Sequence, residues 1–64
     1  MTGRKFKIGE LVELKRIPGM DAPRGPYEIV GLFPPEDGVP VYRIKSWHEE
    51  HERVADEAHL APFG

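Results

Sequence analysis

The stretch YEIVGLFPPEDGVPVYRIKSW, residues 27–47, decides the fold of this chain. Two apolar runs rich in β-branched and aromatic residues flank the break PPEDG at 34–38. Proline cannot donate to a sheet ladder, and Asp-Gly favours a tight reversal. We therefore predict a β-hairpin with one strand over 27–33 and the next from 39 to 46 or 47. Within the first of these strands, Gly31 is the expected point for a sharp bend.

Length and composition set the limits around that hairpin. The chain has 64 residues, a net charge of −2 and no cysteine, so we predict one domain over 1–64 with 1–5 frayed, and we exclude disulfides and thiolate metal sites. A chain this short is marginally stable alone, and oligomerisation is one of its usual supports. It has neither a signal-like segment nor an apolar run of the roughly 20 residues that span a bilayer. We expect a cytoplasmic protein with no membrane partner.

Before the hairpin, one short segment alternates between apolar and polar residues. Phe6, Ile8, Val12 and Leu14 share one parity, and most residues between them are polar. This pattern predicts a half-buried strand from residue 6 to residue 17, with a bend or bulge at Gly9.

The segments on either side of the hairpin complete the layout. Three prolines and two glycines over 18–26 predict a long loop, which Met20 is expected to pin to the rest of the fold. A short strand is expected over 53–55. Asp56 then suits the cap of a single helical or 3₁₀ turn, after which Leu60 is expected to cover the open end of a barrel.

The order of these elements over 6–60 resembles that of the SH3-like small barrels. The resemblance implies an all-β, SH3-like small barrel of about five short strands with a single 3₁₀ turn near the C-terminus. Within that group the chain is similar to short uncharacterised bacterial proteins with an F-x-x-G opening and a Y-R-I-K-S strand, here residues 6–9 and 42–46. That likeness implies an architecture and no activity.

The chain also resembles the type II dihydrofolate reductases, which are tetramers of SH3-like chains. The residues that carry this likeness are Phe6, Gly9, Glu10, Val12, Ile29, Val30, Gly31 and Leu60. The active pore of that family is built from a V-Q-I-Y run. The corresponding residues 52–55 of this chain, ERVA, lack both the Gln and the Tyr, so the resemblance implies the fold and carries over no catalytic residue.

A histidine cluster follows the third predicted strand. His48 and His51 lie three residues apart among glutamates, and on a helix they would share a face with Glu52 and bind a divalent metal. The spacing H-E-E-H is one residue shorter than the metalloprotease pattern H-E-x-x-H, and the flanking segments are predicted strands. We therefore favour a charged hairpin tip that responds to pH over a metal site, and we predict no cofactor.

Trp47 presents two alternatives. If the third strand extends that far, its parity places Trp47 beside Arg43 and Lys45, and the three form a candidate binding face for a base or an aromatic side chain. If the strand has already turned, Trp47 covers the end of the barrel. We favour burial, because large apolar residues in a small domain are usually core. On the same ground we expect Tyr27, Phe33 and Tyr42 to be core rather than a groove for proline-rich peptides.

The motifs of the chain leave three candidate functions. The leading prediction is a non-catalytic binding module whose partner is another protein or a second copy of the chain. The first alternative is an RNA- or DNA-binding barrel that uses a basic outer strand face, although the net negative charge counts against it. The weaker alternative is an oligomeric enzyme with an active site between subunits, because no catalytic arrangement is evident within one chain.

Overall fold

The computed structural model describes residues 3–15, 18–19 and 21–63. The elements, in chain order, are β1 (Leu11–Leu14), β2 (Tyr27–Glu36), β3 (Val39–Ser46), β4 (Arg53–Asp56), the 3₁₀ turn η1 (Glu57–His59) and β5 (Leu60–Pro62). All strand pairs are antiparallel and form one sheet in the order β4-β3-β2-β1-β5. The predicted all-β fold with five short strands and one 3₁₀ turn is confirmed.

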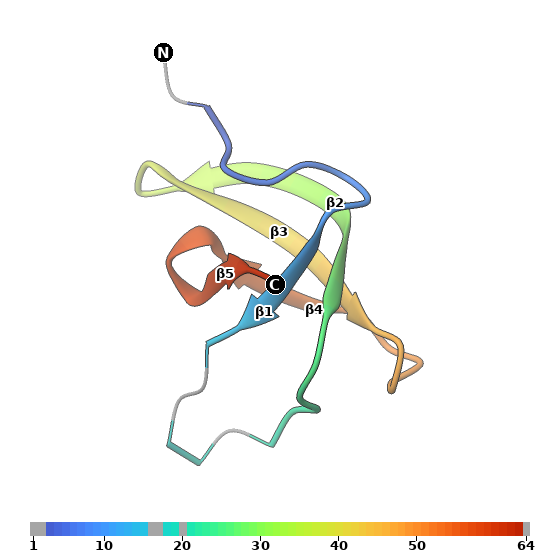
Figure 1. Cartoon of the computed structure of the whole chain (residues 1–64). Helices are drawn as coiled ribbons and strands as arrows, with labels where there is room; N and C mark the ends of the chain where they lie inside the picture. The colour runs from blue at the N-terminus through green and yellow to red at the C-terminus, as the bar shows by residue number, and fades with distance from the viewer. Residues whose placement is uncertain (1–2, 16–17, 20, 64) are drawn as a thin grey trace.

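The sheet curls on itself without closing into a ring (Figure 1). Strand β4 forms one edge and β5 the other, although η1 joins them directly in the chain. The sheet is therefore curled, as the prediction of a barrel requires, but its two edge strands are not paired with each other. Within the described ranges, no helix is long and apolar enough to cross a membrane.

The turn of the β2–β3 hairpin is shorter than predicted. Strand β2 continues to Glu36, and the reversal consists of Asp37 and Gly38, with φ angles of 52° and 79°. Two successive left-handed residues are the signature of the tight turn that matches the twist of the flanking strands. The prolines at 34–35 lie inside β2, where the register with β3 shifts between Phe33 and Glu36. At such an irregularity a residue need not donate an N–H to the neighbouring strand, so proline is tolerated.

A second irregularity in β2 confirms the bend predicted at Gly31. The register with β3 shifts between Ile29 and Gly31. A Cβ atom at Gly31 would lie 3.1 Å from the Cβ of Arg43 on the neighbouring strand. Glycine therefore lets the two strands approach closely where β2 coils most strongly.

The first strand is shorter than the alternation predicts. Strand β1 begins only at Leu11, because Gly9 adopts a φ of 90° and the Glu10 N–H donates to the Lys7 carbonyl at 3.0 Å. Ile8 lies in this turn and is 56% exposed rather than buried, whereas Phe6, which has the same parity, is buried. The predicted strand end at residue 17 and the predicted loop anchor Met20 lie outside the described residues.

The core is one cluster formed by residues of β1, β2, β3 and β5 and by Phe6, with Ala55 of β4 packed against it. Its buried members are Phe6, Val12, Tyr27, Ile29, Tyr42, Ile44 and Leu60. The rings of Phe6 and Tyr42 meet edge to face with centroids 5.7 Å apart. The predicted cap at Asp56 is confirmed, since its side chain accepts from the His59 N–H, and so is the burial of Leu60 after the turn.

Part of the segment expected to fray is anchored. The Arg4 guanidinium lies 5.2 Å from the centre of the Tyr42 ring and donates to the carbonyl oxygens of Phe33 and Val41. The Lys5 N–H donates to a Glu57 carboxylate oxygen at 2.8 Å. These contacts correct the prediction of fraying for Arg4 and Lys5, while residues 1–2 lie outside the described ranges.

Candidate interface at the edge of strand β4

Trp47 is exposed. Its residue is 68% accessible, because β3 ends at Ser46 and a turn begins at Trp47. The buried Ser46 hydroxyl accepts the His48 N–H at 3.0 Å and so fixes the start of that turn. The expectation that Trp47 covers the end of the barrel is wrong, and the smaller Leu60 is buried in the core cluster instead.

The two cations predicted to flank Trp47 are already engaged by this chain. The Arg43 guanidinium lies 5.0 Å from the centre of the Phe33 ring and 3.3 Å from a Glu52 carboxylate oxygen. The Lys45 ammonium donates to the Glu49 carbonyl at 3.0 Å. Phe33 is only half-buried, so of the three aromatics expected in the core only Tyr27 and Tyr42 lie there.

The centre of the link between β3 and β4 is Glu49 rather than the histidines. Its carboxylate accepts from the Nε and Nη2 of Arg53 at 2.9 and 2.6 Å, and only 9% of its side chain is accessible. These hydrogen bonds hold the pKa of Glu49 below its ordinary value and raise the pKa of Arg53. The pair fastens the link to the first residue of β4.

His51 lies at the outside of the same pair. Its Nε2 is 3.3 Å from a Glu49 oxygen, and its side chain is largely accessible. In the part of the chain that the structure describes, no group of three or more His, Asp or Glu side chains is arranged to hold a metal ion. His48 contributes its backbone N–H to the turn and His51 contributes its ring nitrogen to the Glu49 carboxylate, so the two histidines have different roles in the link.

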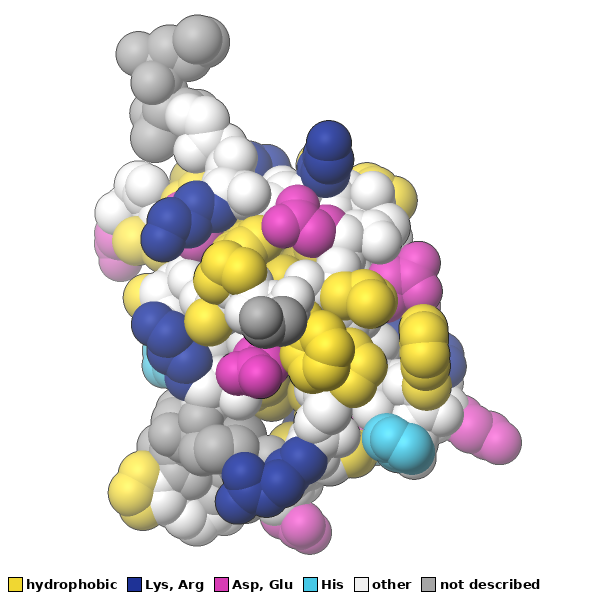
Figure 2. Space-filling model, in the orientation of Figure 1, with side chains coloured by type: hydrophobic (Ala, Val, Ile, Leu, Met, Phe, Trp, Pro, Cys, Tyr) yellow, Lys and Arg dark blue, Asp and Glu magenta, His cyan; other side chains and the backbone are white. Residues whose placement is uncertain are grey.

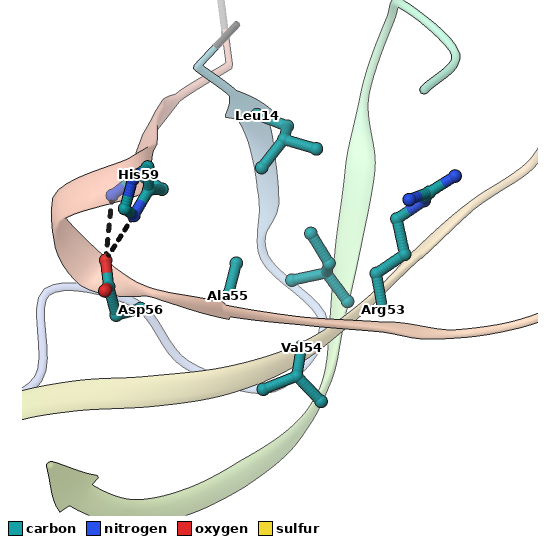
Figure 3. A pocket seen from close by; sticks show the side chains of 7 residues that line it. Leu14, Arg53, Val54, Ala55, Asp56 and His59 are labelled. Atoms are coloured by element: carbon teal, nitrogen blue, oxygen red, sulfur yellow. Dashed lines mark hydrogen bonds and ion pairs between the residues drawn. The ribbon is translucent and has the colours of Figure 1, made fainter. Parts of the chain in front are cut away.

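A hollow of about 350 Å³ opens beside β4, where the sheet is not closed (Figure 3). Its floor is apolar and formed by Leu14 of β1, Ile44 of β3 and Ala55 of β4. Its rim is polar: the His59 Nδ1 is 2.8 Å from an Asp56 oxygen, and this contact lowers the pKa of Asp56.

Four successive residues line this hollow, from Arg53 to Asp56. Successive side chains of a strand point to opposite faces of the sheet. All four can border one hollow because the backbone edge of β4 faces it. Strand β4 pairs with β3 on its other side and ends the sheet here. An edge with unpaired backbone groups is a template for a further strand.

A second hollow, of about 340 Å³, lies on the outer side of the same strand. It is lined mainly by apolar side chains, those of Phe33, Pro34, Pro35, Val41 and Val54. Val54 borders both hollows and is 64% exposed. Apolar surface therefore flanks the edge of β4 on both sides.

Exposed apolar side chains are not confined to β4. The large ones among the described residues are Ile8, Leu32, Trp47, Val54 and Phe63. Figure 2 shows hydrophobic side chains at the surface around the C-terminal end of the chain, with charged side chains of both signs among them. What distinguishes Val54 from the others is its place on a sheet edge between two hollows.

Comparison with protein-family models, curated proteins and solved structures finds no match to this chain. The resemblance to SH3-like barrels and to type II dihydrofolate reductases stays a prediction.

The sequence predicts the strand that contains Val54, but it does not predict that this strand forms an edge of the sheet. A run of three residues, Arg53 to Ala55, carries no signal that it forms a sheet edge. Leu14 joins the hollow from β1, far away in sequence, and His59 joins it from η1, which follows β4 directly. The only available signal is the length of the run, since short strands are common at sheet edges.

Proposed function

We propose that this chain is a non-catalytic protein-interaction module that binds an extended segment of a partner protein along the edge of β4. The carrying observation is that four successive residues of an edge strand border one hollow with an apolar floor. In this mode of recognition, main-chain hydrogen bonds supply affinity and alternate side chains enter pockets.

The two hollows suit the alternation of an added strand. Side chains on one face of that strand would enter the hollow floored by Leu14, Ile44 and Ala55. Side chains on the other face would cover Val54 and the surface around Phe33. Burial of apolar area on both faces adds to the main-chain hydrogen bonds.

Selection from a library of random nine-residue peptides tests this proposal. Selected peptides are expected to shift the amide signals of β4 in NMR spectra and to lose binding, by about tenfold or more, when V54K places a charge on the edge. L32K is the matched control, because Leu32 is also exposed, at 46%, but lies on β2 away from both hollows. An unsuccessful selection, or equal loss in both variants, would contradict the proposal.

The exposure of Trp47 favours a second candidate, the binding of RNA or DNA on the face formed by Arg43, Lys45 and Trp47. An accessible indole is a stacking platform for a base. The ion pair of Arg43 with Glu52 reduces the positive charge offered to a phosphate backbone, and the hydrogen bond of Lys45 to the Glu49 carbonyl occupies one of its donors.

The single tryptophan makes this second candidate easy to test. Mixed-sequence oligonucleotides at low salt are expected to quench the Trp47 fluorescence, and R43E/K45E is expected to abolish the quenching, because phosphate contacts dominate affinity. Fluorescence that oligonucleotides leave unchanged would remove nucleic acid from consideration. Quenching that persists in R43E/K45E would show that Arg43 and Lys45 do not hold the phosphate backbone.

A further inference from the structure

The edge of β4 lies in a strongly acidic stretch of the chain. Residues 49–57, EEHERVADE, contain five acidic residues and one basic residue, a formal balance of −4 with histidine neutral. Arg43 on the neighbouring strand contacts Glu52, and both side chains remain more than two-fifths accessible. The field along this edge therefore favours a positively charged neighbour.

Carboxylates stand at the two ends of the edge, and Arg53, Val54 and Ala55 lie between them, with the Arg53 guanidinium held by Glu49. Glu52 precedes β4, Asp56 ends it, and Val54 lies at its centre. Directly opposite residues of paired strands have Cβ atoms about 4.5–5.5 Å apart. On a strand added beside β4, the two residues opposite Glu52 and Asp56 are therefore four residues apart in sequence. Between these two, the added strand meets Val54 on one face and the hollow beside Ala55 on the other.

A second copy of this chain does not supply that pattern. No two of its nine lysines and arginines lie four residues apart. Two copies of β4 paired antiparallel about Val54 would place Glu52 of each opposite Asp56 of the other, and like charges directly opposite one another are destabilising. Pairing about Ala55 would place the apolar Val54 opposite Asp56.

From these observations we infer that the partner of β4 is an extended segment of another protein with a Lys or Arg at both ends of a three-residue apolar run. This inference rests on the proposed function and adds the chemistry of the partner. The two basic side chains meet Glu52 and Asp56, the middle residue of the run meets Val54, and the two residues beside it face the hollow lined by Leu14, Ile44 and Ala55.

Two synthetic peptides test the inference on the whole chain. One carries Lys-Val-Ile-Val-Lys between Gly-Ser flanks, and the other carries Glu-Val-Ile-Val-Glu between the same flanks. By fluorescence anisotropy at low salt, we expect the basic peptide to bind about tenfold or more tightly than the acidic one. In about 1 M salt, where the Debye length falls to about 3 Å, the difference is expected to shrink.

A charge-removing variant assigns the preference to this edge. E52Q/D56N keeps the cap of η1, because Asn caps as well as Asp, and is expected to lose most of the preference for the basic peptide. E13Q removes one charge from an exposed position on β1 and is expected to keep that preference.

The possible results separate this inference from the function on which it rests. Equal binding of both peptides, with NMR shifts at β4, would overturn the basic partner and leave strand addition standing. A preference that E52Q/D56N leaves unchanged would overturn the inference too. Failure of both peptides to bind would overturn it as well, and the function would then be judged by the library selection.

Discussion

At the scale of single residues, the Tyr42 hydroxyl joins the N-terminal segment to the rest of the fold. It donates to a Glu57 oxygen at 2.6 Å and accepts the Phe6 N–H at 3.3 Å. Burial, and then the hydrogen bond to Glu57, raise the pKa of Tyr42. Although burial alone would raise the pKa of Glu57, its hydrogen bonds from Tyr42 and the Lys5 N–H hold that pKa below the ordinary value.

Removal of this hydroxyl is expected to destabilise the chain more than removal of the other tyrosine hydroxyl. Y42F leaves the buried Phe6 N–H without its partner and removes one of the two hydrogen bonds to the Glu57 carboxylate. Hydrogen bonds to charged groups contribute about 1.5–3 kcal/mol to the free energy of unfolding. The Tyr27 hydroxyl donates to the neutral Pro23 carbonyl at 2.8 Å, so Y27F is expected to cost about 1 kcal/mol. Urea unfolding followed by circular dichroism measures both. A larger loss in Y27F would contradict this assignment.

At the scale of elements, the sequence predicts strands well where the pattern is local. The third predicted strand, the cap at Asp56 and the bend at Gly31 all appear in the structure. The errors arise where a turn or a register shift changes the pattern. Gly9 takes a left-handed conformation and ends the alternation, and the prolines at 34–35 remain in β2 because the ladder is irregular there.

The candidate interface depends on the order of the strands in space, which no local pattern contains. The sequence suggests Arg43, Lys45 and Trp47 by parity, and the structure shows that Trp47 is accessible. The hollow beside β4 exists only because β5 pairs with β1 and leaves β4 as an edge. The groups that contact Arg43 and Lys45, the Glu52 carboxylate and the Glu49 carbonyl, also come from the link after β3, and these contacts could not be predicted from spacing alone.

At the scale of the whole molecule, three carboxylates hold the later part of the chain together. Glu49 accepts from Arg53, Asp56 contacts His59, and Glu57 accepts from Tyr42 and Lys5. Each has its pKa lowered in the folded chain. The unfolded chain therefore binds more protons than the folded chain when the solution is acidic, and stability must depend on pH.

The direction of that dependence is fixed by the lowered pKa values. The stabilisation from these three groups is present above the ordinary values of 4.5 for Glu and 3.8 for Asp, and it is lost as the pH falls through the lower folded values. We expect the urea midpoint to be lower at about pH 3 than at about pH 6.

The variant E49Q is expected to reduce this dependence of the urea midpoint on pH, because it removes one of the titrating groups. The exposed neighbour Glu50 supplies the matched variant E50Q, which also removes one carboxylate and is expected to keep the slope of the parent chain. A midpoint that does not change with pH, or equal flattening in E50Q and E49Q, would show that the contacts of Glu49 with Arg53 do not stabilise the folded chain.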